Sequence, residues 1–120
     1  MAERISFITH RGHEIFYVDY ASLKGQEFVD VIRACGRELQ RCGKTRILLL
    51  INLENSVVTR EIAGIMREDT AVTKQFVYKL AIVGANAFHR ILASLVISAT
   101  NNKLMHYFKE MEAAKDWLIE

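Results

Sequence analysis

The residues that decide the fold are Arg46–Ile65, with the sequence RILLLINLENSVVTREIAGI. Five consecutive aliphatic residues, Ile47–Ile51, are too few for a helix and are rich in strand formers, which predicts a strand buried on both faces. A mostly polar stretch, Asn52–Ser56, comes next. Thr59 is a good N-cap residue and precedes a helical pattern that begins at Arg60. A buried strand, a polar loop and a helix start are together typical of a site in an α/β protein.

Length and charge exclude several classes of protein. The 120 residues predict one domain, residues 1–120, because a chain of this size buries roughly two thirds of its unfolded surface. Sixteen basic and 14 acidic residues leave a net charge of +2, which is too balanced to indicate binding to nucleic acid or to an anionic membrane. The longest stretch without charge, residues 91–102, is too short to cross a bilayer, so we expect no transmembrane segment.

The two cysteines indicate a reducing compartment. Cys35 and Cys42 lie seven residues apart in one predicted helix, which separates them by about 10 Å along its axis. A disulfide requires Cα atoms within about 7 Å, so an internal bridge is not expected. The N-terminus has no apolar segment of a signal peptide. We therefore expect a cytoplasmic protein with reduced thiols that face the core.

Apolar periodicity divides the chain into nine elements. Strands are expected at 5–9, 14–20, 47–51, 77–83 and 104–108, and helices at 22–43, from residue 60, at 87–100 and at 110–119. The order predicts an α/β fold with a mixed, mostly parallel sheet of about five strands. It opens with an N-terminal antiparallel hairpin and is covered by about four helices.

Two of the predicted helices carry side chains that conflict with a simple amphipathic pattern. Asp69 falls inside the apolar stripe of the helix that begins at Arg60, which predicts a break near Asp69. In the helix 87–100 the predicted core face includes Phe88 and Ile91, and the outer face is nearly apolar as well. Packing within the fold, a homodimer face centred on Ile97, or the wall of a lipophilic pocket would each account for that outer face.

The order of elements resembles the STAS domain, the fold of anti-sigma-factor antagonists, and most closely its SpoIIAA-like branch, also called STAS/SEC14-like. The resemblance covers nearly the whole chain. The residues that carry it are Ala81-Ile82-Val83-Gly84, Phe88, Phe108, Ala114 and Trp117-Leu118. It implies a regulatory module that acts by protein–protein contact, or a binder of small lipophilic ligands as in the SEC14 comparison.

The sequence departs from that family at its phosphorylation motif. Anti-sigma antagonists carry an Asp-Ser-Ser-Gly-like motif before the helix that follows the central strand, whereas this chain has Asn55-Ser56-Val57-Val58-Thr59. Ser56 and Thr59 supply hydroxyl groups, but the Asp and the Gly are missing. These two residues are candidate phosphoacceptors by position, with helix capping as the alternative role.

The remaining candidate residues mark two surfaces. Ligand- or partner-binding candidates at the carboxyl ends of two strands are Asn52, Asn55, Ser56, Thr59, Gly84 and Asn86, although turn formation explains the Asn and Gly residues equally well. Arg33, Arg37 and Arg41 form a basic column on one helix, either a solvated face or a contact for an acidic partner. No metal-ligand pattern is visible, and neither a metal nor another cofactor is predicted.

Three functional hypotheses follow from the sequence. The first is a non-catalytic regulatory module that contacts a protein partner through residues 52–59, with a homodimer as one form. The second is a carrier or sensor of a small lipophilic ligand held between the sheet and the helices after residues 59 and 86. The third is an enzyme, which is the least favoured because no activated nucleophile or acid–base pair is visible.

Overall fold

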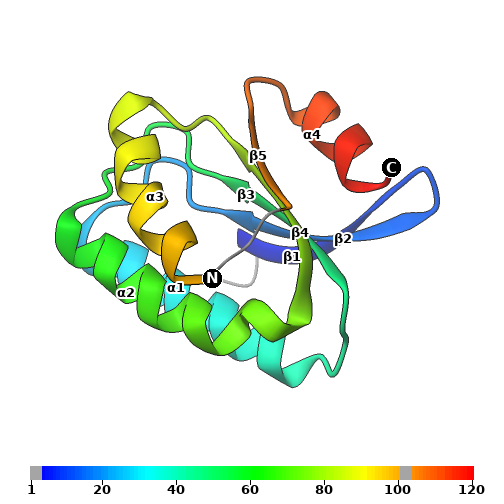
Figure 1. Cartoon of the computed structure of the whole chain (residues 1–120), viewed down its shortest axis with the longest axis horizontal. Coiled ribbons are helices and arrows are strands. Elements are labelled where there is room, and N and C mark those ends of the chain that lie inside the picture. Colours follow the sequence, from blue (N-terminus) through cyan, green and yellow to red (C-terminus); the bar gives the residue numbers. More distant parts are fainter. Residues whose placement is uncertain (1–3, 101–103) are drawn as a thin grey trace.

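The central element of the fold is β3, Ile47–Asn52, which lies in the middle of a five-stranded sheet. The computed structural model describes residues 4–100 and 104–120 (Figure 1). The sheet has the order β1-β2-β3-β4-β5, with an antiparallel β1–β2 pair and parallel pairs elsewhere. The other strands are β1 Ile5–His10, β2 His13–Asp19, β4 Val77–Val83 and β5 Met105–Phe108. The predicted fold class is therefore confirmed.

Helices cover both faces of this sheet. The first three are α1, Gly25–Arg41; α2, Arg60–Thr73, which continues into the 3₁₀ turn η2, Lys74–Phe76; and α3, Ala87–Thr100. They lie on one face, with α2 between α1 and α3, and α4, Met111–Leu118, lies on the other (Figure 1). The core is correspondingly divided: Leu49 belongs to the cluster under α1 and α2, and its neighbour Leu50 belongs to the cluster under α4. Burial of β3 on both faces is confirmed.

Lys79 is a buried lysine in β4, and the fold gives it partners. Its Nζ donates to the carbonyl oxygen of Trp117 at 2.9 Å and to that of Glu120 at 3.4 Å. It also lies 4.8 Å from the centroid of the Trp117 ring. A cation at the C-terminal end of a helix is stabilised by the free carbonyl groups there. Lys79 thus ties the last turn of α4 to the sheet.

The predicted break near Asp69 is wrong. The helix α2 runs without interruption through Asp69, which lies on the face that packs against α1. The hydroxyl groups of Thr70 and Thr73 donate to the carbonyl oxygens of Met66 and Asp69, four residues earlier. Such bonds let threonine occupy a helix interior with its hydrogen-bonding capacity satisfied. The first helix is also shorter than predicted: Ser22 has a positive φ, and α1 begins only at Gly25 and ends at Arg41.

The predicted core face of α3 is wrong at two residues. Phe88 and Ile91 are exposed, with 56% and 65% of their surface accessible, whereas His89 and Leu92 are buried. Hydrogen bonds of the His89 ring to the loop after β3 fix the rotation of this helix and leave Phe88 and Ile91 outside. The side chains of residues 93 and 95–100 lie outside the described residues, and this includes Ile97.

Candidate functional site

The polar loop after β3 is held firmly at the carboxyl edge of the sheet. The amide of Asn52 accepts from the backbone N–H of Glu54, and Asn55 has a left-handed backbone with φ 58°. Gly84, at the end of β4, has φ 78°, and a Cβ on it would lie 2.8 Å from the backbone nitrogen of Glu54. Only glycine fits so close an approach. The loop residues that were predicted as ligand-binding candidates therefore have turn-forming roles in this structure.

Asn86 and Thr59 cap the two helices that begin at this edge. The side-chain oxygen of Thr59 accepts from the N–H of Ile62 at 3.1 Å, and that of Asn86 accepts from the N–H of His89 at 2.8 Å. Each bond satisfies one of the free N–H groups at a helix start. Thr59 itself is exposed. The capping role expected of Thr59 is thus present, and its hydroxyl remains within reach of solvent.

Ser56 lies beside His89, but the pair is not arranged for catalysis. The Nδ1 atom of His89 accepts from the N–H of Asn86 at 3.1 Å, so its hydrogen is on Nε2. Nε2 donates to the carbonyl oxygen of Ser56 at 2.8 Å. The Ser56 hydroxyl donates to the carbonyl oxygen of Leu53 at 2.7 Å. A general base would have to accept the serine proton, and here the ring presents a donor.

The burial of Ser56 limits the access of a kinase to its hydroxyl group. Only 6% of its surface is accessible, and its hydroxyl points inward. A kinase needs the hydroxyl in solvent, so the conformation of this loop favours Thr59 over Ser56.

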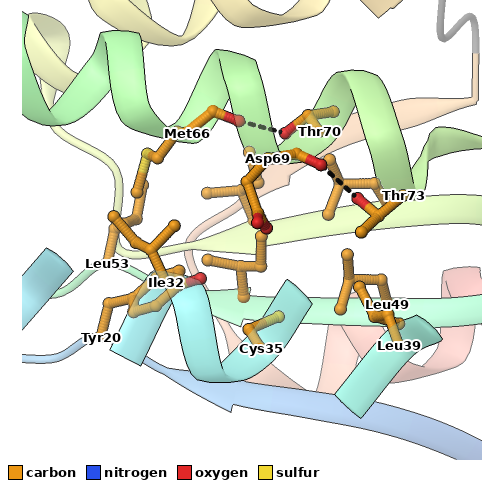
Figure 2. A pocket seen from close by; sticks show the side chains of 13 residues that line it. Tyr20, Ile32, Cys35, Leu39, Leu49, Leu53, Met66, Asp69, Thr70 and Thr73 are labelled. Atoms are coloured by element: carbon orange, nitrogen blue, oxygen red, sulfur yellow. Dashed lines mark hydrogen bonds between the residues drawn. The ribbon is translucent and has the colours of Figure 1, made fainter. Parts of the chain in front are cut away.

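An apolar cavity of about 110 Å³ lies between the sheet, α1 and α2 (Figure 2). It opens partly to solvent. Aliphatic side chains from β3, β4 and α1 form most of its wall, and α2 contributes Met66, Asp69, Thr70 and Thr73. The sequence hypothesis of a pocket between the sheet and the helix after residue 59 corresponds to this position. The second helix at the cavity is α1, and none of the described lining residues belongs to α3.

Asp69 is the charged residue in the described lining of the cavity. Its carboxylate points from α2 toward the centre of the cavity in Figure 2. Burial raises its pKa, and the positive charges of Arg33 and Arg37 oppose that rise. Within the described residues the carboxylate makes no hydrogen bond and no ion pair. An acceptor without a partner in an apolar site is a natural anchor for a ligand donor.

Tyr20 and Cys35 are two further polar residues in the cavity wall. Both side chains are buried, and they lie close enough for each group to influence the pKa of the other. Burial raises the pKa of the Cys35 thiol to about 12 and raises that of the Tyr20 hydroxyl. Cys35 is therefore a thiol at neutral pH, and a thiol is a poor nucleophile.

The basic column and the histidines have no common site. Arg33, Arg37 and Arg41 are exposed, and Arg41 pairs with Glu38 at 2.7 Å. His10 forms a hydrogen bond with Asp116 of α4 at 2.7 Å. Within residues 4–100 and 104–120, no three His, Cys, Asp or Glu side chains are grouped as metal ligands would be. In the same residues no helix has the length and apolar character needed to cross a membrane.

Asp69 is the site residue that sequence reasoning missed. The sequence does show a carboxylate inside an apolar stripe, but that conflict predicts a helix break and not a buried carboxylate. The sequence of α2 alone does not reveal that the facing residue on α1 is Gly36, which leaves room for this carboxylate.

No protein-family model, curated protein or solved structure matches the chain. The resemblance to the STAS domain therefore remains a prediction from the sequence.

Proposed function

We propose that this protein is a non-catalytic binding module that takes a small, largely apolar ligand into the cavity between the sheet, α1 and α2. The observation that carries the proposal is an apolar cavity with a carboxylate, Asp69, that has no partner among the described residues. An SEC14-like lipophilic-ligand function would agree with this cavity. The free thiols of Cys35 and Cys42 support a cytoplasmic location.

The cavity volume limits the size of the group that enters. Pockets for drug-sized ligands measure roughly 300–1,000 Å³, and an apolar cavity of about 150 Å³ is sufficient for benzene. At about 110 Å³, this cavity is smaller than that and partly open, so it suits a short branched chain or one small ring that reaches toward the open side. A longer ligand would leave its remaining atoms at the open side.

Titration with toluene, followed by amide NMR shifts, tests the proposal. We expect saturable shifts in residues of α1, α2, β3 and β4 that line the cavity. Leu49 lines the cavity and Leu48 faces α4, so Leu49→Phe fills the site and Leu48→Phe is a matched control on the opposite face. Binding should disappear in the first variant and persist in the second. Absence of saturable shifts in the native protein would overturn the proposal.

A second candidate function is recognition of a protein partner at the carboxyl edge of the sheet. The specific observation is exposure of Val57, Phe88 and Ile91 on and beside the loop 52–59, because large apolar side chains in solvent often mark contact surfaces. Thr59 lies on the same loop. A regulatory module of this kind would lose partner capture on Val57→Asp or Thr59→Glu while keeping its fold. Equal capture by both variants and the native chain would refute it.

A further inference from the structure

The polar groups around the cavity differ in what they offer a ligand. The hydroxyls of Thr70 and Thr73 donate to backbone carbonyl oxygens at 2.7 Å and 3.1 Å, so their hydrogens are engaged and their oxygens retain lone pairs. The Tyr20 hydroxyl and the Cys35 thiol lie close to each other in the wall and are both neutral groups at neutral pH. The Asp69 carboxylate offers acceptor oxygens without a partner. The described wall thus offers a charged acceptor, Asp69, together with neutral polar groups, and it contains no cationic donor.

Positive charge lies near this site but does not line it. Arg33 and Arg37 act on Asp69 through space, yet both are exposed on α1, and neither belongs to the cavity wall. No Lys, Arg or His appears in the described lining. An anionic head group that entered the cavity would meet the Asp69 carboxylate with no cation inside to receive it, and burial of an unpaired charge is costly.

Gly36 determines how deeply Asp69 reaches. A Cβ on Gly36 would lie 2.3 Å from Oδ1 and 2.6 Å from Oδ2 of Asp69, so any side chain on residue 36 would displace the carboxylate. With glycine there, the carboxylate lies against the backbone of α1, at the centre of the cavity in Figure 2. The acceptor is therefore held where α1 and α2 meet, beside the apolar wall.

We propose that the cavity selects ligands in which a small apolar body carries a hydrogen-bond donor, an amine or a hydroxyl group, and that it rejects carboxylic acids and other anionic lipid head groups. Asp69 receives the donor, and the aliphatic residues of the sheet and α1 pack around the body. This inference rests on the proposed function, because it assigns a ligand class to the same cavity. It separates this protein from a carrier of fatty acids or phospholipids.

The test uses four probes that share one ring and differ in one substituent: toluene, benzyl alcohol, benzylamine and benzoate. Affinities come from NMR titration of the full chain. We expect benzylamine and benzyl alcohol to bind about tenfold tighter than benzoate, because only the amine and the alcohol can donate a hydrogen bond to the charged carboxylate of Asp69. The ratio of benzylamine to benzyl alcohol shows whether the positive charge or the donor hydrogen dominates.

Two variants test whether the ligand preference depends on Asp69 itself or on negative charge near the cavity in general. Asp69→Asn keeps the shape and removes the charge, whereas Glu68→Gln removes the same charge from the exposed neighbour on α2. Asp69→Asn should abolish the preference for benzylamine over benzoate and leave toluene binding unchanged. Glu68→Gln should alter neither. Amide spectra of both variants verify that the fold is retained.

The outcomes separate this inference from the proposed function. Failure of all four probes, toluene included, would overturn the ligand site itself and the inference with it. Binding of toluene with equal affinity for benzoate and benzylamine would overturn the donor selection and leave the cavity as a ligand site. Equal effects of Asp69→Asn and Glu68→Gln would remove Asp69 as the anchor.

Discussion

The carboxylate of Asp69 occupies the space that a side chain would need at Gly36. A Cβ added to Gly36 would approach Oδ1 to 2.3 Å, far inside van der Waals contact. This relationship joins α1 to α2 and explains why a continuous helix carries a carboxylate on its packed face. The contribution of this contact to stability must therefore be measured with Gly36 and Asp69 substituted both singly and together.

Gly36→Ala should destabilise the native protein and stabilise an Asp69→Ala background. In the native background the added methyl forces the carboxylate or the helices apart, and overpacking of this kind costs about 1–3 kcal/mol. Without the carboxylate, alanine should stabilise α1 by about 1 kcal/mol over glycine. A double-mutant cycle from urea unfolding measures the coupling between the two residues.

Gly64 provides the control for that cycle. It lies in α2, and a Cβ there would meet nothing within 4 Å. Gly64→Ala should raise stability by about 1 kcal/mol in either background. Additive effects of Gly36→Ala and Asp69→Ala would show that the close approach has no energetic consequence.

Asp69→Asn should raise stability at neutral pH and lose that advantage in acid. Burial raises the pKa of Asp69 in the folded state, so the fold binds this proton more tightly than the unfolded chain does. The group therefore favours folding below its ordinary pKa of 3.8 and opposes folding once pH exceeds the raised value. The measurement is the free energy of unfolding of both proteins from acid to neutral pH.

Asp116→Asn should have the opposite effect on stability at neutral pH. The hydrogen bond from His10 lowers the pKa of Asp116, so its carboxylate stabilises the fold above the ordinary value, and the stabilisation disappears as pH falls through the lowered pKa. Asp116→Asn should therefore be less stable than the native protein at neutral pH. The same pH trend in both variants would contradict the assigned causes.

The architecture was predictable because it depends on runs of residues within single elements. The aliphatic run Ile47–Ile51 and the strand expected at 77–83 correspond to β3 and β4, and their parallel pairing brings the loop after Asn52 beside Gly84 as expected. Thr59 caps α2 because its hydroxyl needs only the local N–H of Ile62. Local hydrogen bonds and local periodicity are the features that a sequence displays directly.

The errors lie where two elements meet. The helix break predicted at Asp69 is wrong because the space for this carboxylate comes from Gly36, which belongs to another helix. Apolar periodicity places Phe88 on the core face of α3, but His89 is buried instead because its ring has hydrogen-bond partners in Ser56 and Asn86. The position of the pocket beside α2 could be anticipated, but the carboxylate in its wall could not, since the placement of Asp69 depends on the packing of α1 against α2.

Lys79→Met should loosen α4. The substitution keeps much of the length and apolar volume of the side chain but removes the donor to the carbonyl oxygens of Trp117 and Glu120. Loss of hydrogen bonds from a buried charged group should cost about 1–3 kcal/mol. Hydrogen exchange of the α4 amides, with exposed Lys109→Met as control, measures the effect. Exchange rates that match in the two variants would show that Lys79 does not anchor α4.

The tautomer of His89 gives the most direct check on whether Ser56 and His89 are arranged as a catalytic pair. The N–H of Asn86 points at Nδ1, so nitrogen NMR of the ring should show a proton on Nε2 and none on Nδ1. Because Nε2 then donates to the carbonyl oxygen of Ser56, His89→Leu should cost about 1–3 kcal/mol through unpaired backbone groups and should change no hydrolytic rate. A proton on Nδ1 would instead leave Nε2, 3.5 Å from the Ser56 hydroxyl, free to accept the serine proton, and Ser56 would become a candidate nucleophile.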